Sequence, residues 1–131
     1  MLVIPRSIID EVISHLKEEY PFEGCGVLIG KGRTVSESVR LTNKDKSEVS
    51  YQADPLEQYG LLKRLDEEHL ELLCIYHSHP AGESVPSPKD ISLAYFNCYY
   101  MIVCLAHSDT PQIRLFSIEN GAYREEKFEF K

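Results

Sequence analysis

The sequence predicts a single α/β (α+β) domain in which helices flank a curved, mostly antiparallel sheet. Three observations support this prediction. Segments with helical spacing of apolar residues alternate with short runs rich in β-branched and aromatic residues. Gly-containing turn signals separate several of these runs, which favours hairpins. The length of 131 residues suits one hydrophobic core, so the domain is expected to span residues 1–131.

Turn and cap signals divide the N-terminal half into elements. Pro21 ends an amphipathic helical pattern, Lys31-Gly32 indicates a tight turn, and Asp54-Pro55 is typical of an N-cap and a first helical residue. In chain order, the expected elements are a helix over 7–20, strands over 25–30 and 34–41, a polar loop over 43–47, a short strand over 49–52 and a helix from 55 to about 69.

The second of these helices is expected to bury one apolar stripe against the sheet. That stripe consists of Leu56, Tyr59, Leu62 and Leu65. In the C-terminal half, the expected elements are a strand over 72–76, a helix from 88 to about 95, and strands over 99–106, 112–118 and 122–130. The pair Asn120-Gly121 favours a tight hairpin turn between the last two strands.

The centre of the sequence carries a candidate metal site. His77 and His79 follow the apolar run 72–76, and the period of two in a strand places both imidazoles on one face. Ser87, followed by proline, is typical of a helix N-cap, which places Asp90 in the first helical turn. Two imidazoles and one carboxylate are suitable ligands for Zn²⁺, and they leave the fourth position of a tetrahedral site to water.

Each part of this pattern has a simpler interpretation when it is taken alone. His-x-His on a strand is often a half-exposed pair without a metal, and Ser-Pro-Lys-Asp is often an ordinary capped helix start. The conjunction is much rarer. With average residue usage, H-x-H-x7-S-x-x-D arises by chance in on the order of one in several thousand chains of this size.

This pattern, together with Glu23 upstream, resembles the signature of the JAMM (MPN+, JAB/MPN/Mov34) zinc metalloproteases of the compact prokaryotic type. The resemblance implies a cytidine-deaminase-like fold and one Zn²⁺ per chain, bound by His77, His79 and Asp90. It also implies that Glu23 is the general base and that Ser87 donates to the developing oxyanion. The implied reaction is hydrolysis of peptide or isopeptide bonds after the C-terminal Gly-Gly of ubiquitin-like or sulfur-carrier β-grasp proteins.

Composition limits the partners and the location. The net charge is −7 and Lys and Arg are not clustered, which argues against a nucleic-acid partner. The apolar run at residues 1–4 is interrupted by Pro5 and Arg6, and no run is long enough to span a bilayer. We therefore expect no membrane partner and a cytoplasmic protein, and we leave its oligomeric state open.

Four other functions compete with this prediction. A catalytically inactive scaffold of the same fold would be expected to lack ligands, but all are present. A non-peptidase zinc hydrolase is a second class; a zinc deaminase of this class would need H-x-E and P-C-x-x-C signatures together, and the sequence has no P-C-x-x-C. A general zinc peptidase without a ubiquitin-like partner stays open, as does a binding module in which zinc is structural and has a fourth protein ligand.

The four cysteines occur singly in apolar or strand-like contexts, so reduced, buried thiols are expected. A redox-sensitive pair of Cys25 and Cys74 is left open, because both lie close in sequence to the candidate site. His107, after the strand expected over 99–106, could approach the substrate side, although a surface loop is the simpler interpretation.

Overall fold

The structure is a computed structural model that describes residues 1–94, 96–106 and 110–131. The helices are α1 (Arg6–Glu19), α2 (Pro55–Glu68) and α3 (Pro88–Ser92). The strands are β1 (Leu2–Ile4), β2 (Cys25–Lys31), β3 (Thr34–Leu41), β4 (Glu71–His79), β5 (Tyr99–Cys104), β6 (Gln112–Glu119), β7 (Ala122–Glu126) and β8 (Phe128–Phe130). None of the helices in these ranges is long and apolar enough to cross a membrane.

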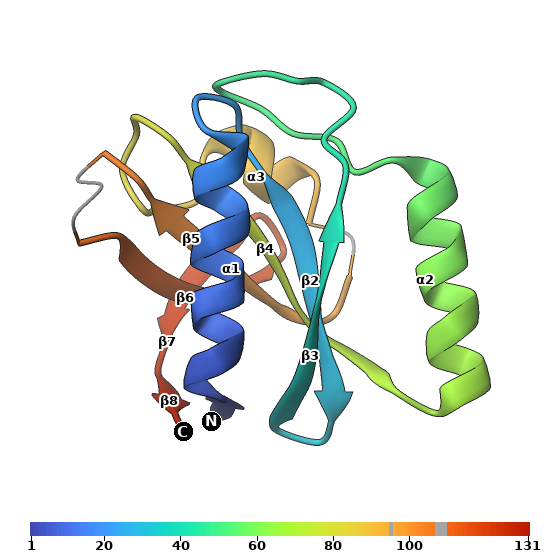
Figure 1. Cartoon of the computed structure of the whole chain (residues 1–131). Helices are drawn as coiled ribbons and strands as arrows, with labels where there is room; N and C mark the ends of the chain where they lie inside the picture. Colours follow the sequence, from blue (N-terminus) through green and yellow to red (C-terminus); the bar gives the residue numbers. More distant parts are fainter. Residues whose placement is uncertain (95, 107–109) are drawn as a thin grey trace.

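The strands form one mixed sheet in the order β7-β6-β5-β4-β2-β3-β1-β8 (Figure 1). Within the described ranges, four of the seven strand pairs are antiparallel, so the sheet is antiparallel by a narrow margin. The central pair β4–β5 is parallel, and a parallel pair needs a crossover connection. That crossover contains α3, which therefore begins near the end of β4 where the two histidines lie.

The sheet is so strongly curved that its two edge strands, β7 and β8, are consecutive in the chain. Only Lys127 separates β7 from β8, yet β7 pairs with β6 and β8 pairs with β1 at the other end of the strand order. The prediction of one strand over 122–130 was therefore wrong. β1 was not predicted at all, although Leu2 and Ile4 are fully buried in this pairing, which also brings the two termini together (Figure 1).

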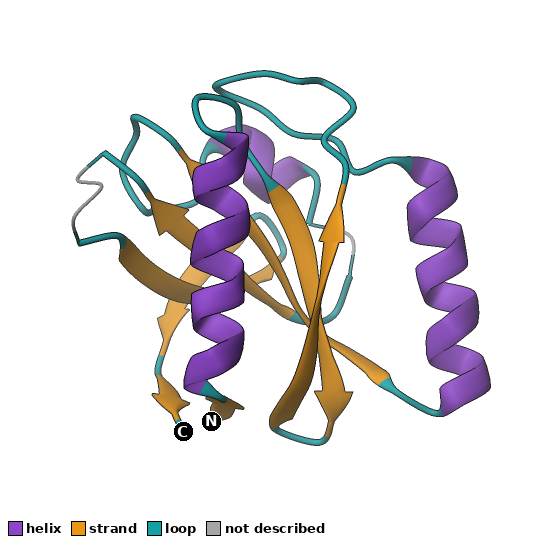
Figure 2. Ribbon diagram, in the orientation of Figure 1, coloured by secondary structure: helices purple, strands orange, loops and turns teal. Residues whose placement is uncertain are grey.

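Strand alternation separates two apolar clusters on opposite faces of the sheet. Helix α1, which lies in front of the strands in Figure 2, packs Val12 and Leu16 against a cluster that includes Tyr76. Helix α2 packs Leu61 and Leu65 against the cluster on the other face, which contains alternate residues of β2 and is flanked by partly buried residues of β4. Because successive residues of a strand point to opposite faces and Tyr76 faces α1, His77 faces the side of α2.

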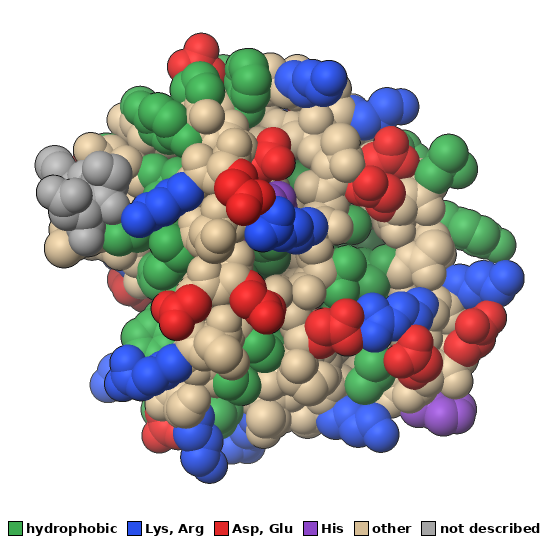
Figure 3. Space-filling view, viewed as in Figure 1, with side chains coloured by type: hydrophobic (Ala, Val, Ile, Leu, Met, Phe, Trp, Pro, Cys, Tyr) green, Lys and Arg blue, Asp and Glu red, His purple; other side chains and the backbone are tan. Residues whose placement is uncertain are grey.

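The predicted inward stripe of α2 was largely wrong. Leu65 is buried as expected, but Leu56 is 82% exposed, Tyr59 69% and Leu62 43%. The helix contacts the sheet through Leu61 and Leu65 instead, which lie four residues apart on one face. Apolar side chains are consequently left on the outside of α2, where hydrophobic atoms gather in Figure 3.

The other element boundaries show which local sequence signals predicted the structure correctly and which did not. The Asp54 cap and the Asn120-Gly121 turn were confirmed, the turn having φ values of 51° and 77°. The strand expected over 49–52 is absent, and a loop with a single bridge between Asn43 and Ala53 replaces it. Helix α3 ends at Ser92, earlier than predicted, and β5 ends two residues early.

Candidate metal centre

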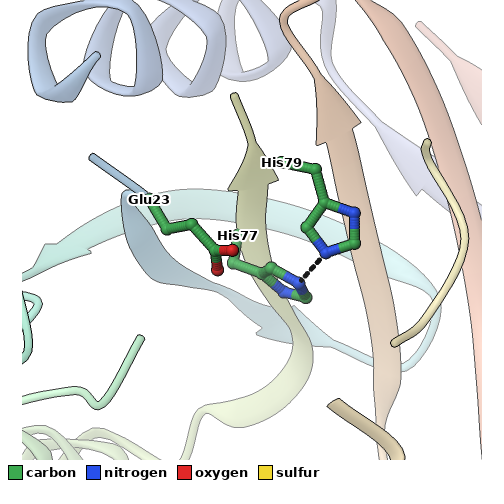
Figure 4. A group of neighbouring side chains, drawn as sticks. All are labelled: Glu23, His77 and His79. Atoms are coloured by element: carbon green, nitrogen blue, oxygen red, sulfur yellow. Dashed lines mark hydrogen bonds between the residues drawn. The ribbon is translucent and has the colours of Figure 1, made fainter. Parts of the chain in front are cut away.

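Three side chains converge beyond the end of β4. His77 and His79 are the last two residues of β4 that point to the α2 side, and their Nε2 atoms lie 3.1 Å apart (Figure 4). The Oδ2 atom of Asp90 lies 3.2 Å from Nε2 of His77 and 3.1 Å from Nε2 of His79. The structure therefore brings the three predicted ligands together in a nearly equilateral triangle.

The size of this triangle fits a tetrahedral metal ion. Ligands about 2.0–2.1 Å from Zn²⁺ lie roughly 3.3–3.4 Å from one another in ideal tetrahedral geometry. The separations of 3.1–3.2 Å are close to that value, and two imidazole nitrogens with one carboxylate oxygen are a common donor set for this ion. The residues present thus fit a bound divalent metal.

Neighbouring groups fix the two imidazoles. The Nδ1–H of His79 donates to the carbonyl of Glu83 at 2.5 Å, which leaves the lone pair of Nε2 directed into the triangle. Burial opposes protonation of His79, but the Asp90 carboxylate and the Glu83 carbonyl together raise its pKa. The ring of His77 stacks on Tyr51 with centroids 4.5 Å apart, and burial lowers its pKa despite Asp90. His77 is therefore held neutral, the form that binds metal.

The capping box of α3 places Asp90. The backbone N–H of Ser87 donates to Oδ2 of Asp90 at 2.8 Å, and the backbone N–H of Asp90 donates to Oγ of Ser87 at 3.1 Å. Burial alone would raise the pKa of Asp90, but the hydrogen bonds from His77 and His79 hold it well below its usual range. The hydroxyl of Ser87 accepts a hydrogen bond here and keeps its own proton available for donation.

Glu23 lies beside the triangle, just before β2. Its side chain is 4% exposed, and it can join His77 and His79 with ligand atoms within 4.8 Å of one another (Figure 4). Among the described residues, its Oε1 atom is buried without a hydrogen-bond partner. Burial raises the pKa of Glu23 to about 7, and this is only partly opposed by His79. Asp90 completes the tighter ligand triangle, so Glu23 is better placed to act on a molecule bound there.

Sequence analysis did not identify three supporting residues. Ser78 accepts from the backbone N–H of Gly24 at 2.9 Å and thereby ties the Glu23 segment to β4. The side-chain amide of Asn43 donates to the carbonyl of Glu23 at 2.8 Å, and Tyr51 stacks on His77. Ser78 could have been suspected from its place within the histidine pair. Asn43 lies in the polar loop that was predicted over 43–47, and Tyr51 lies where a short strand was wrongly predicted, so neither position indicated a role in the site.

An apolar groove of about 530 Å³ lies beside this site. Tyr51, which stacks on His77, and Lys89, which precedes Asp90, both line it. The rest of its lining comes mainly from α2, the loop over 43–53, β4 and the segment after α3, with single residues from β2, β3 and β5. The apolar members are Val27, Leu41, Ala53, Pro55, Leu61, Leu62, Leu72, Ile75, Leu93, Phe96 and Tyr100.

The structure separates the two cysteines that could have formed a redox pair. Cys25 pairs with His77 and belongs to the cluster on the α2 side, whereas Cys74 pairs with Leu28 and belongs to the cluster on the α1 side. Both are buried free thiols, and burial raises the pKa of each. A bond between them is excluded because they lie on opposite faces. His107 lies outside the described residues.

Comparison with known proteins identifies the family. The pattern described as prokaryotic homologues of the JAB domain matches residues 5–119. The chain belongs to this family. It is 39% identical over 122 residues to the "Probable TtuB-protein conjugate cleaving protease" of Thermus thermophilus, covering 92% of this chain and 78% of that protein. It is 31% identical over 129 residues to the CysO-cysteine peptidase of Mycobacterium tuberculosis, covering 96% and 88%.

Other similarities agree with this assignment. The desampylase of Haloferax volcanii is 32% identical over 102 residues, which cover 72% of this chain and 73% of that protein. A solution structure of a protein from Desulfitobacterium hafniense matches with a TM-score of 0.91 at 30% identity, covering 100% of this chain and 93% of the other. A JAB1/MPN domain protein from Archaeoglobus fulgidus shares the fold, with a TM-score of 0.69 at 19% identity and coverage of 99% and 97%.

These comparisons confirm the predicted resemblance to compact prokaryotic JAMM/MPN proteins and the predicted fold class. The relatives are described as a protease, a peptidase and a desampylase, and this chain has a cluster that can bind a metal ion. The chain is therefore a protease of the prokaryotic JAB family. An inactive scaffold or a deaminase does not account for these findings.

Proposed function

We propose that this protein is a zinc-dependent protease that cuts after the C-terminal Gly-Gly of a ubiquitin-like or sulfur-carrier β-grasp protein. The observation on which this proposal rests is the triangle of His77, His79 and Asp90, whose three edges are close in length to those expected for a tetrahedral zinc site. One Zn²⁺ per chain is proposed, bound by these three ligands, with the fourth position left to water. An open position of this kind favours a catalytic site over a structural one.

The proposed chemistry divides between the ion and the protein. When bound, Zn²⁺ would supply a Lewis acid that acidifies water and polarises the scissile carbonyl. Glu23 would take the proton from the attacking water and pass it to the leaving amine. In the metal-free site, burial raises the pKa of Glu23, which makes its carboxylate a stronger proton acceptor. Ser87 would donate its free hydroxyl proton to the oxyanion, while its oxygen still caps α3.

The groove beside the site supports an extended, largely apolar chain as the substrate. It runs from the stack of Tyr51 on His77 to the face of α2, where Leu62 forms part of its wall. Glycines just before the scissile bond would let the backbone approach the ligand triangle closely. The exposed Leu56 and Tyr59 lie on α2 beyond this wall, and we propose that they contact the folded body of the β-grasp partner.

The relatives support a protein partner of this kind. Their names refer to cleavage of TtuB-protein conjugates, to CysO-cysteine and to desampylation, and two of them match more than 90% of this chain. For this chain, binding of the partner's body would supply energy that is used in catalysis. An isolated tail should therefore be cut more slowly than the same tail on its folded protein.

The test compares three substrates with zinc-loaded protein. These are a full-length β-grasp Gly-Gly-X fusion, its isolated tail peptide, and a fusion in which the second glycine is replaced by valine. We expect the fusion to be cut well, the other two poorly, and a chelator to stop the reaction. If the peptide is cut as well as the fusion, or valine is tolerated, the protein is a general zinc peptidase.

A further inference from the structure

The backbone that carries Glu23 is not part of any strand, since β2 begins at Cys25. A loop over residues 43–53 holds it instead. The backbone N–H of Glu23 donates to the carbonyl of Ser47 at 2.7 Å, and its carbonyl accepts from Nδ2 of Asn43 at 2.8 Å. The position of the Glu23 carboxylate therefore depends on this loop, and the buried Oε1 atom has no partner of its own among the described residues.

Asn43 is the residue that organises this loop. It is 6% exposed, and its amide makes four hydrogen bonds. Nδ2 donates to the carbonyls of Glu23 and Ser50, and Oδ1 accepts from the backbone N–H groups of Asp45 and Gln52 at 3.0 and 2.9 Å. Because an amide offers two donors and two acceptor positions, this set uses its full capacity. Aspartate would keep the acceptors but lose both donors.

We propose that Asn43 is a positioning residue for the general base. This inference rests on the proposed function, because it assigns Asn43 to the placement of Glu23 in that reaction. The ligand triangle comes from β4 and α3, and among the described residues the Asn43 side chain makes its hydrogen bonds to other segments. Loss of its donors should therefore displace the base and leave the metal ligands in place. A displacement of about 1 Å can lower turnover by roughly 10²-fold.

The same loop also has contacts with the rest of the site. Asp45, Tyr51 and Gln52 line the groove, and Tyr51 stacks on His77. A disturbed loop could thus weaken substrate binding or metal binding without involving Glu23. A fall in activity on its own would not distinguish these routes, so the experiment must ask whether Asn43 acts through Glu23.

A double-mutant cycle with Asn43→Asp and Glu23→Gln separates the routes. In the wild-type background we expect kcat for the fusion to fall by about 10–100-fold, with KM changed less than about threefold and zinc content unchanged. In the Glu23→Gln background, measured under single-turnover conditions, Asn43→Asp should lower the rate less than about twofold, because no base remains to be positioned. Asn120→Asp makes the same chemical change in the β6–β7 turn and should have no effect on either background.

The other outcomes would overturn the proposal. Equal losses in both backgrounds, loss of zinc, or a change in KM alone would show that Asn43 acts on the fold, the metal or the groove. Asn43→Ala provides a second variant, and failure of both variants to fold would assign Asn43 to folding only. Absence of cleavage by the wild-type protein would reject the proposed function and this inference together. A fully active Asn43→Asp beside an impaired Glu23→Gln would reject this inference alone.

Discussion

Replacing Glu23 by glutamine should lower activity and raise the stability of the metal-free protein. The substitution keeps the shape of the side chain and removes its ability to ionise. Burial raises the pKa of Glu23 from 4.5 to about 7. The native state therefore retains a proton that the unfolded chain releases, and the stability associated with this carboxyl is lost as the pH rises from about 4.5 to 7.

The magnitude follows from the two pKa values. They differ by about 2.5, and each pH unit corresponds to 1.36 kcal/mol, so the loss is at most about 3 kcal/mol. Glutamine does not titrate and escapes this loss. The free energy of unfolding of the Glu23→Gln variant should exceed that of the wild type by about 1–3 kcal/mol at pH 8.5, with little difference below pH 4.5. Turnover should fall by roughly 10²–10⁴-fold, the usual contribution of a positioned base.

Stability is measured by urea unfolding of both proteins in the presence of a chelator, at pH 8.5 and at a pH below 4.5. Turnover is measured separately, as cleavage of the Gly-Gly fusion by the zinc-loaded proteins. Groups that do not interact with Glu23 are common to both proteins and cancel in the difference, whereas His79, whose pKa the Glu23 carboxylate helps to raise, contributes to it. Equal stability at pH 8.5 would show that the carboxylate is well solvated. Unchanged turnover would show that another carboxylate is the base, and Glu83 in the adjacent loop would be the next candidate.

Three further predictions concern the metal and the two faces of the sheet. Substituting alanine for any one ligand should abolish stoichiometric zinc binding by elemental analysis, and retention of zinc in every variant would reject the site. The ligands are His77, His79 and Asp90. Tyr76→Phe removes the hydroxyl that lies 2.7 Å from Nδ1 of the buried His15. Chemical denaturation should show a free energy of unfolding that is lower by about 1–3 kcal/mol. No change would mean that water replaces the hydroxyl. Leu61→Ala should lower the free energy of unfolding by about 2–4 kcal/mol, because Leu61 is buried. Leu56 is exposed, so Leu56→Ala should change that free energy by under about 0.5 kcal/mol and instead raise KM for the fusion. An unaltered KM would exclude α2 from partner binding.

The ligand triangle could be predicted because each of its members is fixed by chemistry within a few residues. Alternation along β4 is enough to place His77 and His79 on one face. The capping box fixes the side chain of Asp90 at the start of α3, as the spacing from Ser87 indicated. These signals depend little on the rest of the fold.

The wrong predictions concern segments whose local pattern was recognised correctly but whose packing or pairing partners were not. The stripe on α2 has helical spacing, and spacing alone cannot distinguish a core contact from a surface left free beside a groove. Similarly, the residues from 122 to 130 have strand character throughout, but the two ends pair with different strands. Neither the exposure of Leu56 nor the break at Lys127 can be predicted from a few neighbouring residues, because both depend on partners that are distant in the sequence.

The position of the base is the clearest case of a feature that local sequence cannot predict. Glu23 depends on a hydrogen bond from Asn43, 20 residues away, and its neighbour Gly24 depends on Ser78, 54 residues away. The first contact exists only after the loop over 43–53 has folded against the Glu23 segment, and the second only after β2 has paired with β4. The base is thus held largely by the loop over 43–53, whereas the ligands are carried by β4 and α3. Substitutions in that loop should therefore be able to change the rate of the reaction while the metal stays bound, which substitutions among the ligands cannot do.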